Sequence, residues 1–178
     1  MFFRRVSGLL VLTALFAARA PLGAVDVDAR QLKAATIVSM LRYVAWRAPA
    51  ASASPRAIAV VGDSHLAAAM RDAAAGQTVD GRALVVTQVA APAQLPDPTP
   101  VVVVLAASQR TAAPAVARSL EARHVLTIGE GEGMGKAGMV IGVYVDGDRI
   151  RFDANTGAAA RAGLTLSSRL LRLARIVG

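Results

Sequence analysis

One short stretch of the sequence brings together three residue types that occur in hydrolase active sites. The stretch reads Gly62, Asp63, Ser64 and His65 and directly follows an apolar segment. A catalytic triad needs side chains that converge from different elements, which neighbours in sequence do not provide. The nucleophile-elbow pattern is also broken, because Leu66 stands where its second glycine belongs. We interpret the stretch as a strand-to-helix turn with an Asp or Ser cap, with a small-ligand site there as the alternative.

A second candidate is the glycine-rich segment at residues 133–138, which has the spacing Gly-x-Gly-x-x-Gly of dinucleotide-binding loops. Such a loop needs a helix directly after it, so that the helix N-terminus faces the pyrophosphate. Here an apolar strand is expected to begin at Met139, and Glu130 and Glu132 would repel a phosphate. Lys136 is followed by alanine, so the segment is not a P-loop either. We predict a flexible loop and no nucleotide cofactor.

Residues that hold metals are scarce in this chain. It has no cysteine and two histidines, His65 and His124. Disulfides, cysteine nucleophiles and thiolate metal sites are therefore excluded, and a multi-histidine centre is not expected. Asp146, Asp148 and Asp153 do not have the spacing of a calcium loop. The sequence predicts no catalytic residue, no metal and no cofactor.

The N-terminal residues predict export from the cytoplasm. Two arginines precede an apolar run at residues 8–18, which is too short to span a bilayer, and small residues follow. We predict a cleaved signal peptide over residues 1–24, with cleavage after Ala20 as the alternative to Ala24. The remaining residues, 25–178, have the length of a single domain. The expected location is the periplasm.

The charge of the chain is positive but dispersed. The formal net charge is +8, and arginines without any basic run carry most of it. Arg169, Arg172 and Arg175 come closest to a basic stripe, and we interpret them as one solvated face of a helix. Together with export, this dispersion argues against a nucleic-acid partner.

Apolar periodicity predicts a helix, then alternating strands and helices, then a hairpin and two closing helices. Asp-Gly at residues 146–147 is a strong hairpin signal. We therefore predict an α/β fold: one three-layer domain whose mixed sheet of about six strands is flanked by helices, with a parallel part and a C-terminal antiparallel hairpin. The expected strands are 57–61, 83–89, 101–105, 125–128, 139–145 and 149–154, and the expected helices 26–46, 64–75, 108–122, 156–162 and 167–176.

Several short segments, taken in their order along the chain, form a specific pattern, although each segment alone is a weak sign of relationship to other proteins. The strongest segments are residues 125–129, 138–141, 149–155 and 162–174, and weaker ones are 33–35 with Tyr43 and Trp46, 60–64 and 76–84. In this order they resemble the YfiR family of periplasmic proteins over residues 26–176. The chain departs from that family at Arg47, where a proline often follows the tryptophan, and at Met134, where the glycine-rich loop usually has an aromatic residue. It also lacks the cysteines that form disulfides in some relatives.

The resemblance implies a non-enzymatic periplasmic regulator. Members of one branch hold the periplasmic domain of a membrane diguanylate cyclase inactive, which limits cyclic di-GMP and biofilm formation. Other relatives are associated with sensor histidine kinases. The alternative function is therefore a periplasmic small-ligand-binding component for such a kinase, with its ligand near residues 62–65.

Two surfaces are candidates for contact with a partner. The first is the predicted hairpin, where core-facing and outward-facing residues alternate and an edge strand offers pairing. Substitution of Ile141 by arginine is expected to release repression without unfolding the domain, unless the hairpin only packs the closing helices. The second is the first helix, where two aromatic residues share a face and either fill the core or form a homodimer seam. The partner-binding candidates are Met139, Ile141, Tyr144, Arg151, Asp153 and Asn155, and the seam candidates are Tyr43 and Trp46.

Overall fold

The computed structural model describes residues 22–46 and 55–178. Most of the predicted signal peptide lies outside the described residues. The first described helix begins at Leu22, so it includes the cleavage position predicted after Ala24. Among the described residues, no helix is long and apolar enough to span a membrane.

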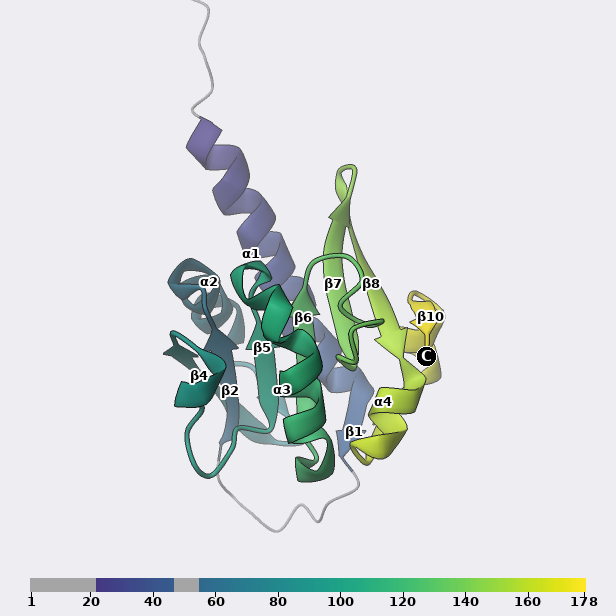
Figure 1. The fold of residues 1–178 in the computed structure, drawn as a ribbon. Helices are drawn as coiled ribbons and strands as arrows, with labels where there is room; N and C mark the ends of the chain where they lie inside the picture. Colours follow the sequence, from purple (N-terminus) through teal and green to yellow (C-terminus); the bar gives the residue numbers. More distant parts are fainter. Residues whose placement is uncertain (1–21, 47–54) are drawn as a thin grey trace, which may run out of the picture.

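A mixed sheet of eight strands forms the centre of the molecule (Figure 1). Its strand order is β10-β8-β7-β6-β5-β2-β4-β3, and β1 and β9 form a separate antiparallel pair. Strands β4, β2, β5, β6 and β7 run parallel to one another, as the alternating pattern predicts for the central strands. The strands are β1 (Val44–Trp46), β2 (Arg56–Val61), β3 (Thr78–Val79), β4 (Arg82–Val89), β5 (Val102–Leu105), β6 (Leu126–Glu130), β7 (Ile141–Asp146), β8 (Arg149–Asn155), β9 (Leu164–Leu166) and β10 (Arg175–Val177).

Helices cover both faces of this sheet, which confirms the predicted three-layer α/β class (Figure 1). One face packs against α1 and α2 and the other against α3, so that buried apolar residues form two separate clusters. Alternate residues of β5 belong to opposite clusters, which explains its uninterrupted apolar sequence. The helices are α1 (Leu22–Met40), α2 (Ser64–Ala74), α3 (Ala113–Leu120), α4 (Thr156–Arg161) and α5 (Ser168–Leu171), with 3₁₀ turns η1 (Leu41–Tyr43), η2 (Pro92–Gln94), η3 (Ala107–Ala112) and η4 (Glu121–Arg123).

The end of the first helix differs from the prediction. The α-helix stops at Met40, and Val44–Trp46 form strand β1, which pairs with β9 through Val44↔Leu166 and Trp46↔Leu164. Valine and tryptophan favour strands, and the pairing partner lies too far along the chain for a local pattern to reveal it. Tyr43 and Trp46 therefore do not share a helical face.

The C-terminal segment also differs from the prediction. The expected helix at residues 167–176 is helical only over Ser168–Leu171, and its last residues form β10. Strand β10 lies beside β8 in parallel, with Arg175 opposite Asp153 and Ile176 opposite Ala154. The arginines at positions 169, 172 and 175 therefore do not line one helix face.

The predicted hairpin is confirmed, and its tip extends beyond the body of the sheet (Figure 1). Strands β7 and β8 pair from Ile141↔Ala154 to Asp146↔Arg149. Strand β6 accompanies β7 only as far as Val143, and β10 accompanies β8 only over Asp153–Asn155. Residues 144–151 therefore form a projecting tip whose outer strand edges have no partner strand among the described residues.

Candidate functional site

The projecting tip, residues 144–151, carries the side chains best placed to meet another molecule. We call it the hairpin tip. Val145 is 52% exposed, Tyr144 is half-buried, and Arg151 is exposed. Cross-strand pairing places Val145 opposite Ile150 and Tyr144 opposite Arg151, so one side of the tip is apolar and the other polar.

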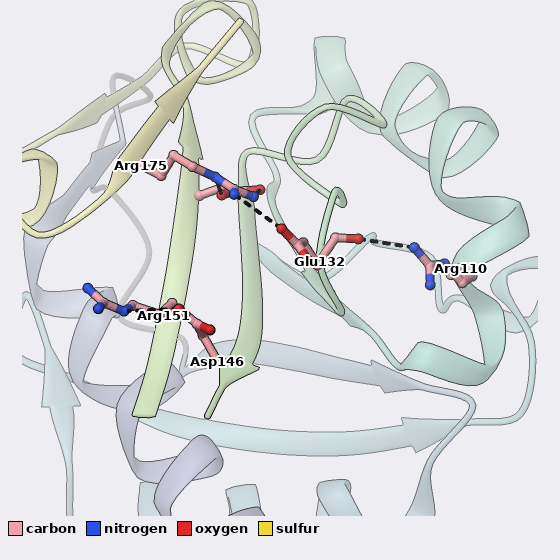
Figure 2. Close-up of polar contacts among 6 residues, drawn as sticks. Arg110, Glu132, Asp146, Arg151 and Arg175 are labelled. Carbon is pink, nitrogen blue, oxygen red and sulfur yellow. Dashed lines mark hydrogen bonds and ion pairs between the residues drawn. The ribbon is translucent and has the colours of Figure 1, made fainter. Parts of the chain in front are cut away.

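The side chain of Arg175 connects the base of the hairpin to the elements around it. The guanidinium of Arg175 donates to Asp153 through both Nε, at 2.7 Å from Oδ1, and Nη2, at 3.2 Å from Oδ2. Its Nη1 donates to Glu132 Oε1 at 3.2 Å (Figure 2). The same guanidinium lies 5.1 Å from the centre of the Tyr144 ring. Because bidentate arginine–carboxylate pairs fix geometry as well as charge, this contact holds β10, β8 and the glycine-rich loop together.

A hydrogen bond on the other side of this loop connects it to η3, which follows strand β5 of the parallel part of the sheet. Arg110, in η3, donates through Nη2 to the carbonyl oxygen of Glu132 at 3.0 Å, so Glu132 joins two arginines from opposite sides (Figure 2). At the tip, Arg151 lies 3.7 Å from Asp146, and both side chains are mostly exposed. Exposed pairs of this kind contribute little to stability. The tip charges are therefore available to a partner.

Two groups at the hairpin base have shifted pKa values. The hydrogen bonds that Arg175 donates to Asp153 and Glu132 raise the pKa of Arg175, so this guanidinium keeps its charge. Burial, followed by the negative charge of Asp153, raises the pKa of the Tyr144 phenol, and Arg175 partly opposes this shift. The phenol therefore stays protonated at neutral pH, as a hydrogen-bond donor beside the exposed tip.

The six predicted partner-binding residues divide sharply by burial. Tyr144 and Arg151 lie on the hairpin tip. The other four are interior residues, so they present no surface to a partner in this fold: Met139, Ile141, Asp153 and Asn155. The expectation that Ile141→Arg leaves the domain folded is wrong, because this side chain is fully buried in the core.

The buried polar residues of this set have structural contacts. Asn155 donates through Nδ2 to the carbonyl of Gly135 at 2.8 Å, and its Oδ1 accepts from Ala158 N–H as the cap of α4. Asp153 accepts both bonds from Arg175. These residues act on the hairpin surface indirectly, by positioning the loop and β10.

The turn at residues 62–65 serves as a helix cap, as predicted. Asp63 accepts from the backbone N–H groups of His65 and Leu66 at 2.8 and 2.9 Å. The carbonyl of Gly62 accepts from Ser108 Oγ at 3.1 Å. The Asp63 carboxylate and the Gly62 carbonyl are thus occupied by the fold, and the ligand site considered at this turn stays a prediction.

The adjacent end of β6 is occupied as well. Lys33 of α1 pairs with Glu130, and the second carboxylate oxygen of Glu130 accepts from Ala107 N–H at 3.1 Å. Among the described residues, no group of three or more His, Cys, Asp and Glu side chains is placed to hold a metal.

Trp46 and Tyr43 have different surroundings. Trp46 lies against Arg56, whose guanidinium carbon is 4.1 Å from the ring centre. Burial lowers the pKa of Arg56, which pairs with Asp80. Tyr43 is 39% exposed. The homodimer seam stays a prediction, now supported by one exposed aromatic residue and not two.

Sequence reasoning missed the three residues that organise the site: Arg175, Glu132 and Arg110. The sequence predicts a helix at Arg175 and indicates for Glu132 only that its charge would repel a phosphate, and neither local pattern indicates the contact between them. The signal that could have found them is the buried Asp153, since a carboxylate in an apolar strand needs a cationic partner.

Comparison with known proteins identifies the family. A family model described as YfiR/HmsC-like matches residues 30–175. No curated protein matches the chain. Among solved structures, a conserved domain protein from Vibrio cholerae is similar at 14% identity, with a TM-score of 0.56 over 84% of this chain and 60% of that chain. An ABC domain in complex with L-Trp from Streptococcus pneumoniae is similar at 13% identity, with a TM-score of 0.58 over 82% and 62%.

These two structures support the fold alone, since both identities are low. The chain also spans only about three fifths of the length of each. The family model, in contrast, extends from α1 to the start of β10 and includes the loop and the hairpin described above. The chain therefore belongs to the YfiR/HmsC-like family of periplasmic regulatory proteins.

Proposed function

We propose that this protein represses a membrane diguanylate cyclase by binding its periplasmic domain, and so limits cyclic di-GMP signalling and biofilm formation. Family membership supports a periplasmic regulatory role. The observation that supports contact with the cyclase domain is the hairpin tip, which projects past the sheet while Arg175 holds the base of the hairpin in place. A projecting element with a fixed base loses less conformational freedom on binding than a mobile one.

The tip offers two kinds of contact. Strand edges at residues 144–146 and 149–152 are not covered by another strand of the described chain, so an extended segment of a partner can add to either edge. Val145 and Ile150 lie on one side of the tip, and register places Ile176 of β10 on the same sheet face. Val145 and Ile176 are each 52% exposed. These exposed side chains offer a partner apolar contacts on one sheet face.

Charge at the tip argues for a selective partner rather than self-association. The tip also carries four exposed charged residues: Arg149, Arg151, Asp146 and Asp148. Charged residues at an open edge discourage pairing between identical copies. A partner with complementary charges would offset them, and its association would weaken as salt increases.

The test compares the same substitution at two exposed valines. Val145→Asp places a charge on the hairpin tip, whereas Val85→Asp does so on β4, near the opposite end of the sheet, where the valine is 45% exposed. The tagged protein would be expressed with its own N-terminus and captured from gently solubilised envelopes. We expect the native chain and Val85→Asp to recover a diguanylate cyclase and keep cyclic di-GMP low.

Val145→Asp should lose the cyclase and raise cyclic di-GMP while remaining exported and folded. Full repression by that variant would refute the role of the tip. Recovery of a sensor histidine kinase in place of a cyclase would refute the proposed partner and support the ligand-sensing alternative.

A further inference from the structure

A cavity of about 330 Å³ lies on the side of the glycine-rich loop away from the hairpin tip. Four elements surround it: α3, the start of β6, the loop and α4. It is distinct from the hairpin surface and from the turn at residues 62–65. Its walls are Pro114, Ala117, Arg118, Glu121, Val125, Thr127, Lys136, Ala137, Gly138, Val140, Ala158, Arg161 and Ala162.

Three cationic side chains from three different elements line this cavity: Arg118 of α3, Lys136 of the loop and Arg161 of α4. Glu121 is the single acidic residue of the lining, and it pairs with Nε of Arg161. Arg118 and Lys136 have no hydrogen bond or ion pair within the part of the chain that the structure describes. All three cations are exposed. The lining therefore carries an excess of positive charge that water partly screens, and a bound anion would interact favourably with it.

The ion pair with Glu121 orients the Arg161 guanidinium but occupies only one of its N–H donors. Arginine has five N–H donors, and the pair with Glu121 occupies Nε, which leaves the Nη donors available. Gly157 gives the guanidinium room, since a Cβ there would lie 3.3 Å from Nη1. Arg161 is thus positioned before any ligand arrives.

The cavity floor is small and nearly apolar, with one polar exception. Thr127 is 4% exposed, and its hydroxyl oxygen accepts from Val140 N–H at 3.1 Å. A hydroxyl that accepts one bond still has its own proton to donate, and this proton is available to a ligand in the cavity. Ala137 and Gly138 also line the cavity, and neither has a long side chain that could fill it.

We propose that this cavity binds a small anion that carries phosphate or carboxylate oxygens on a compact body. The three cations would contact the oxygens, the Thr127 hydroxyl would donate one hydrogen bond from the floor, and the alanines would contact the apolar part. Arginine suits both kinds of oxyanion because its donors form a planar fork. The proposal does not depend on the identity of the regulated partner.

The experiment is calorimetric titration of the purified exported chain with pyrophosphate and with citrate, at low and at physiological ionic strength. We expect one saturable site for at least one of the two probes, with weaker affinity at the higher ionic strength. Binding of pyrophosphate alone indicates a phosphate ligand, and binding of citrate alone indicates a carboxylate ligand. Failure of both probes to bind would overturn the proposal.

Two pairs of variants test the location of binding. Arg118→Gln with Lys136→Gln should weaken the affinity about tenfold for each lost cation. Arg71→Gln with Arg169→Gln removes the same charge from exposed positions outside the cavity and should leave the affinity near the native value. An equal loss of affinity in both pairs would mean that the probes respond only to the overall charge of the protein, and it would refute binding in this cavity.

A third variant tests the cavity itself without changing charge. Ala137→Leu would place a larger side chain at a partly exposed position of the lining, so it should fold and lose the bound probe. Unchanged affinity in this variant would show that the anion binds elsewhere.

Discussion

Gly135→Ala should destabilise the domain although it adds a single methyl group. Gly135 is the point at which the glycine-rich loop touches the hairpin base. A Cβ there would lie 2.8 Å from the Cβ of Asp153 and 2.8 Å from Cγ2 of Val177. Asp153 is fully buried and belongs to β8, so it has little room to retreat. Overpacking of this kind costs about 1–3 kcal/mol. The melting temperature should fall by roughly 3–9 °C for a chain of this length.

Gly157→Ala is the matched control, because the same methyl group meets different surroundings. At Gly157 the nearest atom to a new Cβ is Arg161 Nη1, at 3.3 Å, which is the far end of a flexible side chain. Gly157 lies within α4, where alanine is favoured over glycine by up to about 1 kcal/mol. The two substitutions should therefore change stability in opposite directions.

The assay is urea unfolding and thermal melting of both purified variants beside the native chain. A Gly135→Ala variant as stable as the native chain would refute the close approach of the loop to β8 and β10. Equal destabilisation by the two substitutions would also refute the reasoning, because it would trace the effect to the loss of glycine and not to the contact.

Three further predictions concern single residues. Ile141→Arg places an unpaired charge in a fully buried position, so the exported protein should fail to accumulate in folded form, as periplasmic extracts would show. Asp63→Ala removes the α2 cap and should cost about 1 kcal/mol in urea unfolding; no loss would contradict its capping role. The raised pKa of Tyr144 means that the folded state holds the phenol proton more tightly than the unfolded state, so stability should fall as pH rises above about 10. Tyr144→Phe should remove that part of the alkaline loss, measured by melting across alkaline pH, and an unchanged pH profile would contradict the assignment.

The elements predictable from sequence are those with local causes. The valine run of β5 is apolar without interruption because both sheet faces are covered there. Asp63 begins α2 by a contact within three residues of itself. The hairpin turn follows from its Asp-Gly pair. Each of these signals depends on a few neighbouring residues, which a sequence displays directly.

Two of the errors in secondary structure arise where distant residues decide. Trp46 belongs to a strand because Leu164 lies opposite it, and Arg175 belongs to a strand because Asp153 does. Local periodicity favours a helix at both places, and tertiary pairing overrides it. The buried positions of Ile141 and Asp153 have a related cause. Alternation predicts one exposed face, but helices cover one side of the hairpin base while the loop and Arg175 cover the other.

The glycine-rich segment shows how one spacing can serve two different physical purposes. In a dinucleotide site, the glycines allow a phosphate to approach the backbone. Here Gly135 instead allows β8 and β10 to approach, and Gly138 has a φ of +100° that side-chain-bearing residues rarely adopt. The side-chain amide of Asn155 donates a hydrogen bond to the Gly135 carbonyl and so holds the segment against β8. The spacing matches a nucleotide loop because a chain that turns closely over a sheet needs glycine at those points, whatever it binds.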